Sequence, residues 1–168
     1  YSYKFKSFHP LLGTPRIHAS MIEGGSEWSK VPDSCVLSGE RRILPGESWE
    51  TVRAELNEII ANLRSSGINF EGDVELVNEF PPLETDPKQY VVKKLSEAIK
   101  KANGMEPQLV GLTYWTDGAT IARKGIPTAV FGPGSISVAH APVEYIGAEE
   151  VSKAAVAFRE LILSWGSQ

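Results

Sequence analysis

The sequence contains a single cysteine among its 168 residues, Cys35, so no disulfide can form within the chain. A lone cysteine favours a reducing compartment, and we expect a cytoplasmic protein. No apolar run approaches the length of about 20 residues that a membrane-spanning helix needs. The first residues are aromatic and basic with no apolar stretch behind them, so we expect no secretory signal.

An excess of charge of one sign is also missing. The chain has 17 Lys and Arg against 21 Asp and Glu, and the formal net charge is -4. Without a basic stripe, nucleic acid is not an expected partner, and neither is a membrane. The hydrophobic content of 42% and charged content of 23% are ordinary for a soluble globular protein.

The first half of the chain has strand patterns around one amphipathic helix. Residues 16–22 and 34–43 are bounded by glycine and proline and predict strands. Residues 47–63 repeat apolar side chains at helical spacing, with acidic residues in the first turn, and predict a helix that packs on one face of the sheet. A third strand is expected at 69–78, which completes an α+β unit of about 70 residues.

A Phe-Pro-Pro-Leu run at residues 80–83 breaks this pattern and is the expected domain boundary. The second half alternates helices with short, apolar strands, which is typical of part of a three-layer α/β sheet. The helices are expected from 86 to 103, in a brief segment ending near 125, and from 148 to 165, and the strands at 108–112 and 126–131.

One place in the second half is a candidate for chemistry. The strand expected at 126–131 ends in a Gly-Pro-Gly-Ser loop at 132–135, followed by His140 and Glu144. In open α/β sheets, ligands bind outside the carboxyl ends of the strands, and glycines there let backbone N–H groups approach an anion. The alternative is an ordinary turn with a surface histidine.

Two segments carry a resemblance to a known family. Residues 9–48 contain a Gly-Gly, then Val31-Pro32-Asp33 before a strand, then Arg42 and Leu-Pro-Gly. Residues 114–145 contain Thr116-Asp117-Gly118, the Gly-Pro-Gly-Ser loop and His140. Both resemble, in order, the zinc-dependent family that includes acetylornithine deacetylase, succinyl-diaminopimelate desuccinylase, aminoacylase and glutamate carboxypeptidase.

The resemblance implies an α/β architecture in two parts. Residues 1–80 would be part of the α+β lid (dimerisation) domain, incomplete at its N-terminus, and residues 81–168 would be the C-terminal segment of a three-layer α/β catalytic domain. It implies hydrolysis of an amide bond in an N-acyl amino acid or peptide by two divalent ions, zinc or alternatively cobalt. It also implies a homodimer formed through the lid.

Residue by residue, the resemblance makes His140 a metal ligand, with Glu144 behind it as an outer partner and Asp117 shaping the site. Arg42 and the loop residues would recognise a substrate carboxylate, since an arginine fork pairs with a carboxylate through two bonds. The loop residues concerned are Gly132, Gly134 and Ser135. Simpler interpretations remain: Glu144 and Arg42 as solvated charges, and Asp117 as a helix cap.

Other expected features of the family are missing from these residues. There is no His-x-Asp motif, and we expect the general base and the other metal ligands to lie before residue 1. Glu149-Glu150 resembles the family's catalytic Glu-Glu pair, but we interpret it as acidic residues at a helix start. His9 and His18 are interpreted as structural, and Ser29-Lys30 replaces an asparagine of the family.

Three functions therefore stay open. The chain is part of a metal-dependent hydrolase that is inactive alone, a non-catalytic dimerisation or interaction module from the same family, or a small-anion-binding domain that uses only the glycine loop.

Overall fold

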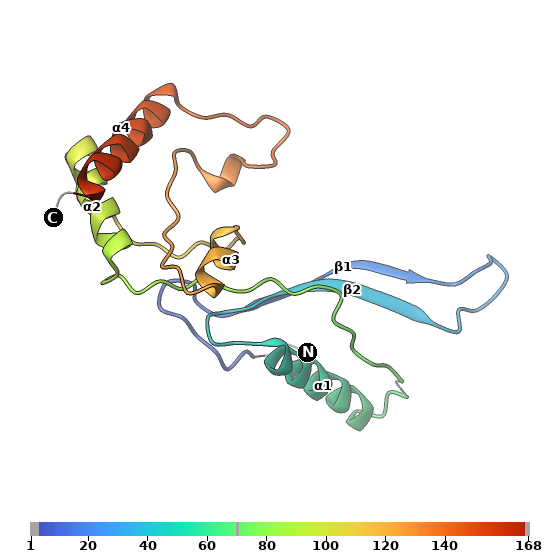
Figure 1. The fold of residues 1–168 in the computed structure, drawn as a ribbon. Coiled ribbons are helices and arrows are strands. Elements are labelled where there is room, and N and C mark those ends of the chain that lie inside the picture. Colours follow the sequence, from blue (N-terminus) through green and yellow to red (C-terminus); the bar gives the residue numbers. More distant parts are fainter. Residues whose placement is uncertain (1–3, 70, 167–168) are drawn as a thin grey trace. The chain divides into compact units, whose positions relative to one another are not determined.

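The computed structural model describes residues 4–69 and 71–166, which fall into two compact units. Among these residues, unit 1 comprises 4–69, 71–82 and 111–115, and unit 2 comprises 83–110 and 116–166. Each unit is described by itself, and its elements carry the labels of Figure 1. The first change of unit lies beside the Phe-Pro-Pro-Leu run, whereas 111–115 groups with unit 1 rather than with the rest of the second half. The assignment of these units to a lid and a catalytic segment stays a prediction.

Unit 1 contains an antiparallel hairpin of β1 (Arg16–Gly24) and β2 (Cys35–Arg42), in which Arg16 lies opposite Arg42. Both strands were predicted from their alternation and from the glycine and proline residues around them, and both are confirmed. The long hairpin projects its connecting loop away from the rest of unit 1 (Figure 1).

A bulge interrupts the hairpin between Ala19 and Met21. Beside it, a Cβ atom on Gly39 would collide with the carbonyl oxygen of His18. Glycine at this position allows the two backbones to approach closely, which is a common reason for glycine inside a strand. A larger residue at position 39 would therefore force the two strands apart beside the bulge.

Helix α1 (Trp49–Ser65) follows the Leu-Pro-Gly turn and confirms the helix predicted at 47–63. Its apolar stripe is only partly covered: Val52 is buried, and Leu56 and Leu63 are half-buried. The predicted packing of this helix over a sheet face is wrong, because the strand residues are exposed except for Arg41, which is half-buried. Only the last part of β2 is linked to α1, through Arg41.

The third strand predicted at 69–78 is wrong for the residues that the structure describes, and residue 70 lies outside them. Residues 71–78 have no strand partner, and Val77 is 92% exposed. The side chains of Asp73 and Asn78 each accept a hydrogen bond from the next backbone N–H, at 2.7 and 2.9 Å. Such local bonds compete with the ladder that a strand requires.

Unit 2 is built around two packed helices, α2 (Tyr90–Asn103) and α4 (Ala148–Trp165). The bounds of α4 agree with the prediction, whereas α2 begins four residues after the predicted start at residue 86 because Asp86 to Gln89 form a turn. The Tyr90 and Trp165 rings meet edge to face at 5.1 Å, and the Tyr90 hydroxyl donates to the Trp165 carbonyl oxygen at 3.2 Å. The buried residues of the two helices are Val92, Leu95, Ala98, Ala154, Ala157 and Glu160.

The strands predicted at 108–112 and 126–131 are wrong: both segments lack a ladder partner in the described part of the chain. An apolar run becomes a strand only where a neighbouring strand satisfies its N–H and C=O groups. The second segment is held instead by the Thr85 hydroxyl, which donates to the Thr128 carbonyl oxygen at 2.5 Å. Two short helices, α3 (Gly118–Arg123) and the 3₁₀ turn η1 (Ile136–Val138), complete unit 2.

The described residues therefore form a mixed α/β chain with one small antiparallel sheet, and the three-layer sheet expected in the second half is not found in them. Among these residues, no helix is both long enough and apolar enough to cross a membrane.

Candidate functional site

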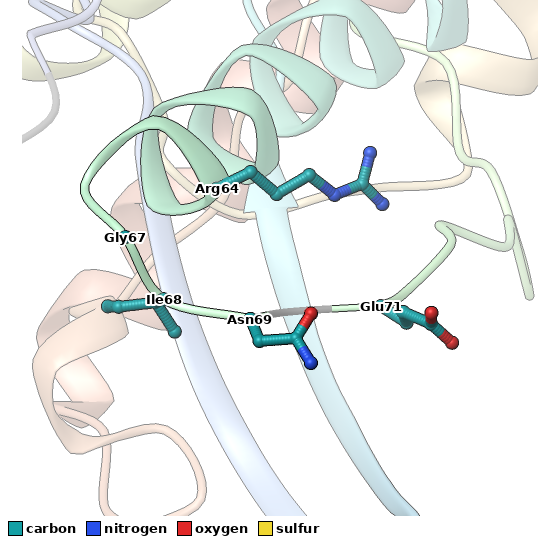
Figure 2. Close-up of a pocket in the computed structure, with 5 residues that line it drawn as sticks. All are labelled: Arg64, Gly67, Ile68, Asn69 and Glu71. Atoms are coloured by element: carbon teal, nitrogen blue, oxygen red, sulfur yellow. The ribbon is translucent and has the colours of Figure 1, made fainter.

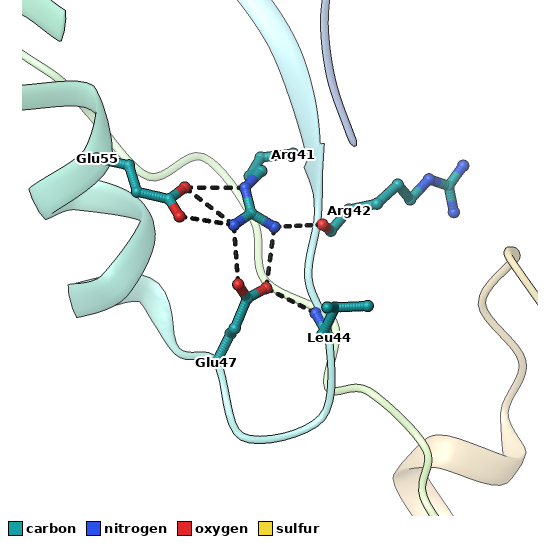
Figure 3. Close-up of polar contacts among 5 residues, drawn as sticks. All are labelled: Arg41, Arg42, Leu44, Glu47 and Glu55. Atoms are coloured by element: carbon teal, nitrogen blue, oxygen red, sulfur yellow. Dashed lines mark hydrogen bonds and ion pairs between the residues drawn. The ribbon is translucent and has the colours of Figure 1, made fainter. Parts of the chain in front are cut away.

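Arg41 and Arg42 are neighbours at the end of β2, but their side chains lie in different environments (Figure 3). The Arg41 side chain is only 5% exposed and pairs with Glu47 at 2.9 Å and with Glu55 at 2.9 Å. Its guanidinium also lies 4.7 Å from the centre of the Phe5 ring. The Arg42 side chain is 46% exposed and pairs with Glu40 on the same strand. The two side chains point in opposite directions, as the alternation of side chains along a strand requires.

Arg41, whose side chain is nearly buried, and Glu47 perturb each other's protonation. Burial would raise the pKa of the Glu47 carboxyl, but hydrogen bonds from Arg41 and from the Leu44 N–H outweigh burial, so the pKa lies below its ordinary value. Burial would lower the pKa of Arg41, but the bonds to Glu47 and Glu55 raise it. Arg41 and Glu47 are therefore both charged near neutral pH, and the cluster links β2 to the turn before α1 and, through Glu55, to the second turn of α1.

We expect Arg41→Met to lower the free energy of unfolding at pH 7 by about 3–5 kcal/mol, because two nearly buried carboxylates lose their shared cation. Arg42→Met is the matched control, and a change within about 0.5 kcal/mol is expected at this exposed position. Urea denaturation of both variants measures the difference.

The effect of Arg41→Met should depend on pH with a defined sign. Because the pKa of Glu47 is lowered in the folded chain, its contribution is full above the unfolded pKa of about 4.3 and is lost as the pH falls through the folded value. The gap between wild type and Arg41→Met should therefore narrow below about pH 4. A gap that stays constant from pH 7 to pH 3 would contradict this assignment.

The glycine loop of unit 2 is fastened to helix α4. Gly134 has a left-handed backbone with φ 91°, and its N–H donates to Oε2 of Glu150 at 3.0 Å. The Ser135 hydroxyl accepts from the Ser137 N–H at 3.3 Å, whereas a Cβ atom on Gly132 would meet open space. The N–H of Gly134 is thus already bound to a carboxylate of the chain itself, which weighs against its predicted use for substrate.

The contact of Glu150 with the loop was missed by the sequence reasoning, which gave this residue only a favourable position at the helix N-terminus. The sequence does contain one indication of this contact, which is a carboxylate in the first turn of the helix that follows the glycine loop. Glu150 therefore anchors the loop to α4, and its interpretation as a helix-start acid without a catalytic role stays a prediction.

His140 is exposed and is the only described non-glycine residue with a positive φ, at 61°. Its backbone N–H donates to Oε2 of Glu144 at 3.3 Å, so Glu144 contacts the backbone of His140. Histidine is among the residues that tolerate this left-handed conformation. The contact with Glu144 involves the backbone of His140 and not its imidazole, and the roles of both residues at a metal stay predictions.

Asp117 directly precedes α3, and its carbonyl oxygen accepts from the N–H groups of Thr120 and Ile121. Its side chain makes no capping hydrogen bond, so the interpretation of its carboxylate as a helix cap is wrong. His9 behaves as predicted for a structural histidine, since its Nδ1 accepts from the Leu11 N–H at 3.2 Å.

The residues that the structure describes contain no group of three or more His, Cys, Asp or Glu side chains able to hold a metal ion. A structural or catalytic zinc site needs three or four protein donors. His140 suits the role of one imidazole donor, but these residues do not fit a complete metal centre by themselves.

Two hollows lie away from the predicted site residues. The larger one, of about 540 Å³, follows the end of α1 and is lined by Arg64, Gly67, Ile68, Asn69 and Glu71 (Figure 2). A smaller one, of about 190 Å³, lies in unit 2 between Glu84 to Gln89 and the turn at Gly125. Neither is lined by His140 or Arg42, so neither supports the predicted site.

Comparison with known proteins identifies the family to which this chain belongs. The model of Peptidase family M20/M25/M40 matches residues 10–164, which is nearly the whole chain. The chain therefore belongs to this family, and the resemblance that rested on the motifs around Arg42 and His140 is confirmed.

Two curated relatives and one solved structure define the similarity further. The chain is 27% identical over 176 residues to N-formyl-4-amino-5-aminomethyl-2-methylpyrimidine deformylase of Bacillus subtilis, covering 98% of this chain and 41% of that protein. It is 30% identical over 146 residues to acetylornithine deacetylase of Myxococcus xanthus, covering 87% and 36%. An M20 family metallo-carboxypeptidase from Sulfolobus solfataricus has a similar fold, with a TM-score of 0.63 and 26% identity, covering 90% of this chain and 36% of that one. The chain thus spans between 36% and 41% of the length of these proteins.

Proposed function

We propose that this chain contributes to the metal-dependent hydrolysis of an amide bond in an N-acyl amino acid or a peptide. The observation that carries the proposal is the family match over residues 10–164. Its relatives are named a deacetylase, a deformylase and a metallo-carboxypeptidase, and these names describe removal of an acyl group or of a terminal residue.

The proposed cofactor is a pair of zinc ions, with cobalt as an alternative. His140 would supply one imidazole donor, and Glu144 would steady the backbone that carries it. The described residues lack a set of three donors, and the proposal assigns the other ligands and the general base to residues outside this chain.

The proposed substrate carries a carboxylate that Arg42 recognises. The exposure of Arg42 supports this role, because its guanidinium is half-exposed and can reach a substrate. The guanidinium of Arg41 is nearly buried, and its charge is neutralised by Glu47 and Glu55. Within the glycine loop, Gly132 remains a candidate contact, because the Gly134 N–H is bound to Glu150 and the Ser135 hydroxyl to Ser137.

The test is hydrolysis by the protein expressed together with a further segment that supplies the remaining ligands and the base that the proposal requires. N-acetylornithine, N-formyl amino acids and dipeptides are assayed for release of the free amino acid, before and after a chelator, and after zinc or cobalt is restored. We expect hydrolysis of at least one substrate, lost on chelation and recovered with metal. A folded, metal-loaded protein that cleaves none of them would contradict the proposal.

The second candidate is a non-catalytic dimerisation or interaction module. It is favoured by the exposed apolar side chains of the hairpin and its connecting loop, among them Ile22, Trp28, Val31 and Leu37. A homodimer through residues 1–80 is compatible with both candidates, and a monomeric mass by light scattering at high micromolar concentration would count against it. Metal content separates the hydrolase from the non-catalytic module, because only the hydrolase needs bound zinc.

A cytoplasmic location is proposed from the single cysteine alone.

A further inference from the structure

One ionic cluster holds two backbone atoms at the end of β2. The Arg41 guanidinium donates to the carbonyl oxygen of Arg42 (Figure 3). Two residues further along the chain, the Leu44 N–H donates to Oε2 of Glu47 at 2.7 Å. The same Glu47 carboxylate takes two hydrogen bonds from Arg41, at 2.9 and 3.0 Å. The backbone that directly follows Arg42, from its carbonyl group to the Leu44 N–H, is therefore held by a single guanidinium–carboxylate pair.

Helix α1 completes the cluster through Glu55. Its carboxylate accepts from Nε of Arg41 at 3.0 Å and from Nη2 of Arg41 at 2.9 and 3.0 Å. The side chains of Arg41 and Glu47 are each 5% exposed, and that of Glu55 is 13% exposed. Ion pairs with so little access to water are screened less than exposed ones and hold their geometry more firmly. The strand end, the Leu-Pro-Gly turn and the helix are thus linked at one point.

The Arg42 side chain points away from this cluster (Figure 3). It is 46% exposed and pairs with Glu40. A guanidinium recognises a carboxylate through two parallel hydrogen bonds, so its direction affects binding as much as its charge does. A side chain of this length is presented reproducibly only when its backbone is immobile, and functional groups held loosely lose efficiency.

We propose that Arg41, Glu47 and Glu55 are positioning residues for Arg42, which fix the backbone from which Arg42 meets the carboxylate of the substrate. The proposal rests on the proposed function of Arg42. It concerns residues that do not themselves touch the substrate, since the charge of Arg41 is satisfied inside the cluster. Glu55, which is far from Arg42 in sequence, would act on substrate binding entirely through Arg41.

The first test measures backbone immobility in the 168-residue chain itself. Glu55→Gln removes one negative charge at nearly constant size and touches Arg41, not Leu44. We expect amide hydrogen exchange at Leu44 to accelerate about tenfold, as a loss of roughly 1.4 kcal/mol in local protection gives. Glu58→Gln, one turn further along α1 where the carboxylate pairs with exposed Lys6 at 3.7 Å, is the matched control and should leave this amide unchanged. Unchanged exchange in Glu55→Gln together with a lowered melting temperature would overturn the proposal.

The second test uses steady-state kinetics of the active protein with N-acetylornithine and with its amide, in which a neutral carboxamide replaces the carboxylate. Glu55→Gln should raise KM for the carboxylate substrate about three- to tenfold and leave kcat and the KM for the amide nearly unchanged. In an Arg42→Met background the same change should have no further effect, because the residue being positioned is gone. Effects of Arg42→Met and Glu55→Gln that multiply independently would overturn the positioning role.

The two tests distinguish a failure of the substrate role of Arg42 from a failure of the positioning role of the cluster. If Arg42→Met leaves KM for the carboxylate substrate unchanged, the substrate role of Arg42 in the proposed function is wrong. If Arg42→Met raises KM while Glu55→Gln changes only stability, the function stands and the positioning role is wrong.

Discussion

His140→Ala is expected to lower the divalent-metal content of the active protein and to reduce turnover by more than the roughly 10–100-fold that loss of an outer partner costs. A neutral imidazole is a good donor for Zn²⁺ or Co²⁺, and a metal centre that loses a direct ligand holds its ion poorly. His140 follows the glycine loop in unit 2 and is exposed, so its imidazole is accessible to a metal. Zinc per chain, determined by elemental analysis, and the rate constant of hydrolysis are the two measurements.

Two variants serve as controls for His140→Ala. His9→Ala removes an imidazole whose Nδ1 is engaged with the Leu11 N–H, and it should leave the zinc content unchanged. Glu144→Gln keeps an acceptor for the His140 N–H and should cost at most about 10–100-fold in turnover. Full zinc content and near-normal turnover in His140→Ala would refute the ligand assignment and leave an ordinary turn with a surface histidine.

The 168-residue chain by itself is expected to hydrolyse N-acetylornithine and dipeptides no faster than buffer. Metal-assisted hydrolysis requires a bound divalent ion and a base that accepts a proton from water. The described residues offer no group of three metal donors, and His140 alone does not replace one. Because enzymes of this kind lower barriers by about 8 kcal/mol or more, losing the metal and base together removes many orders of magnitude in rate.

The measurement is release of ornithine or free amino acid over many hours with added zinc or cobalt. A preparation treated with a chelator is the control, since a contaminating hydrolase would lose its activity there as well. Activity that remains in the purified His140→Ala chain would come from such a contaminating hydrolase. Zinc-dependent hydrolysis by the purified wild-type chain, absent from the His140→Ala chain, would show that the prediction is wrong.

Local signals accounted for much of the secondary structure. The glycine and proline residues around residues 16–24 and 35–42 predicted the two strands, and apolar spacing of three and four residues predicted α1, α2 and α4. These signals succeed because the hydrogen bonds of a helix and of a hairpin join residues near in sequence. The family was also predictable, because its motifs around Arg42 and His140 are short and contiguous.

The wrong strand predictions and the missed loop contact both depend on partners that are distant in sequence. Residues 71–78, 108–112 and 126–131 have strand-like compositions, but a strand exists only where another segment of backbone pairs with it, and composition does not reveal that partner. The contact between Gly134 and Glu150 joins residues 16 positions apart and was missed for the same reason.

The sequence by itself determined the positions of the main helices and of the hairpin, the family, and the fact that Arg41 and Arg42 face opposite ways, because all of these follow from neighbouring residues. Only the tertiary structure decided which arginine is buried, which carboxylates neutralise it and which apolar segments fail to join a sheet. Those outcomes depend on the burial of each group and on partners distant in sequence, as for Arg41 and Glu55, whose attraction is strengthened by the exclusion of water.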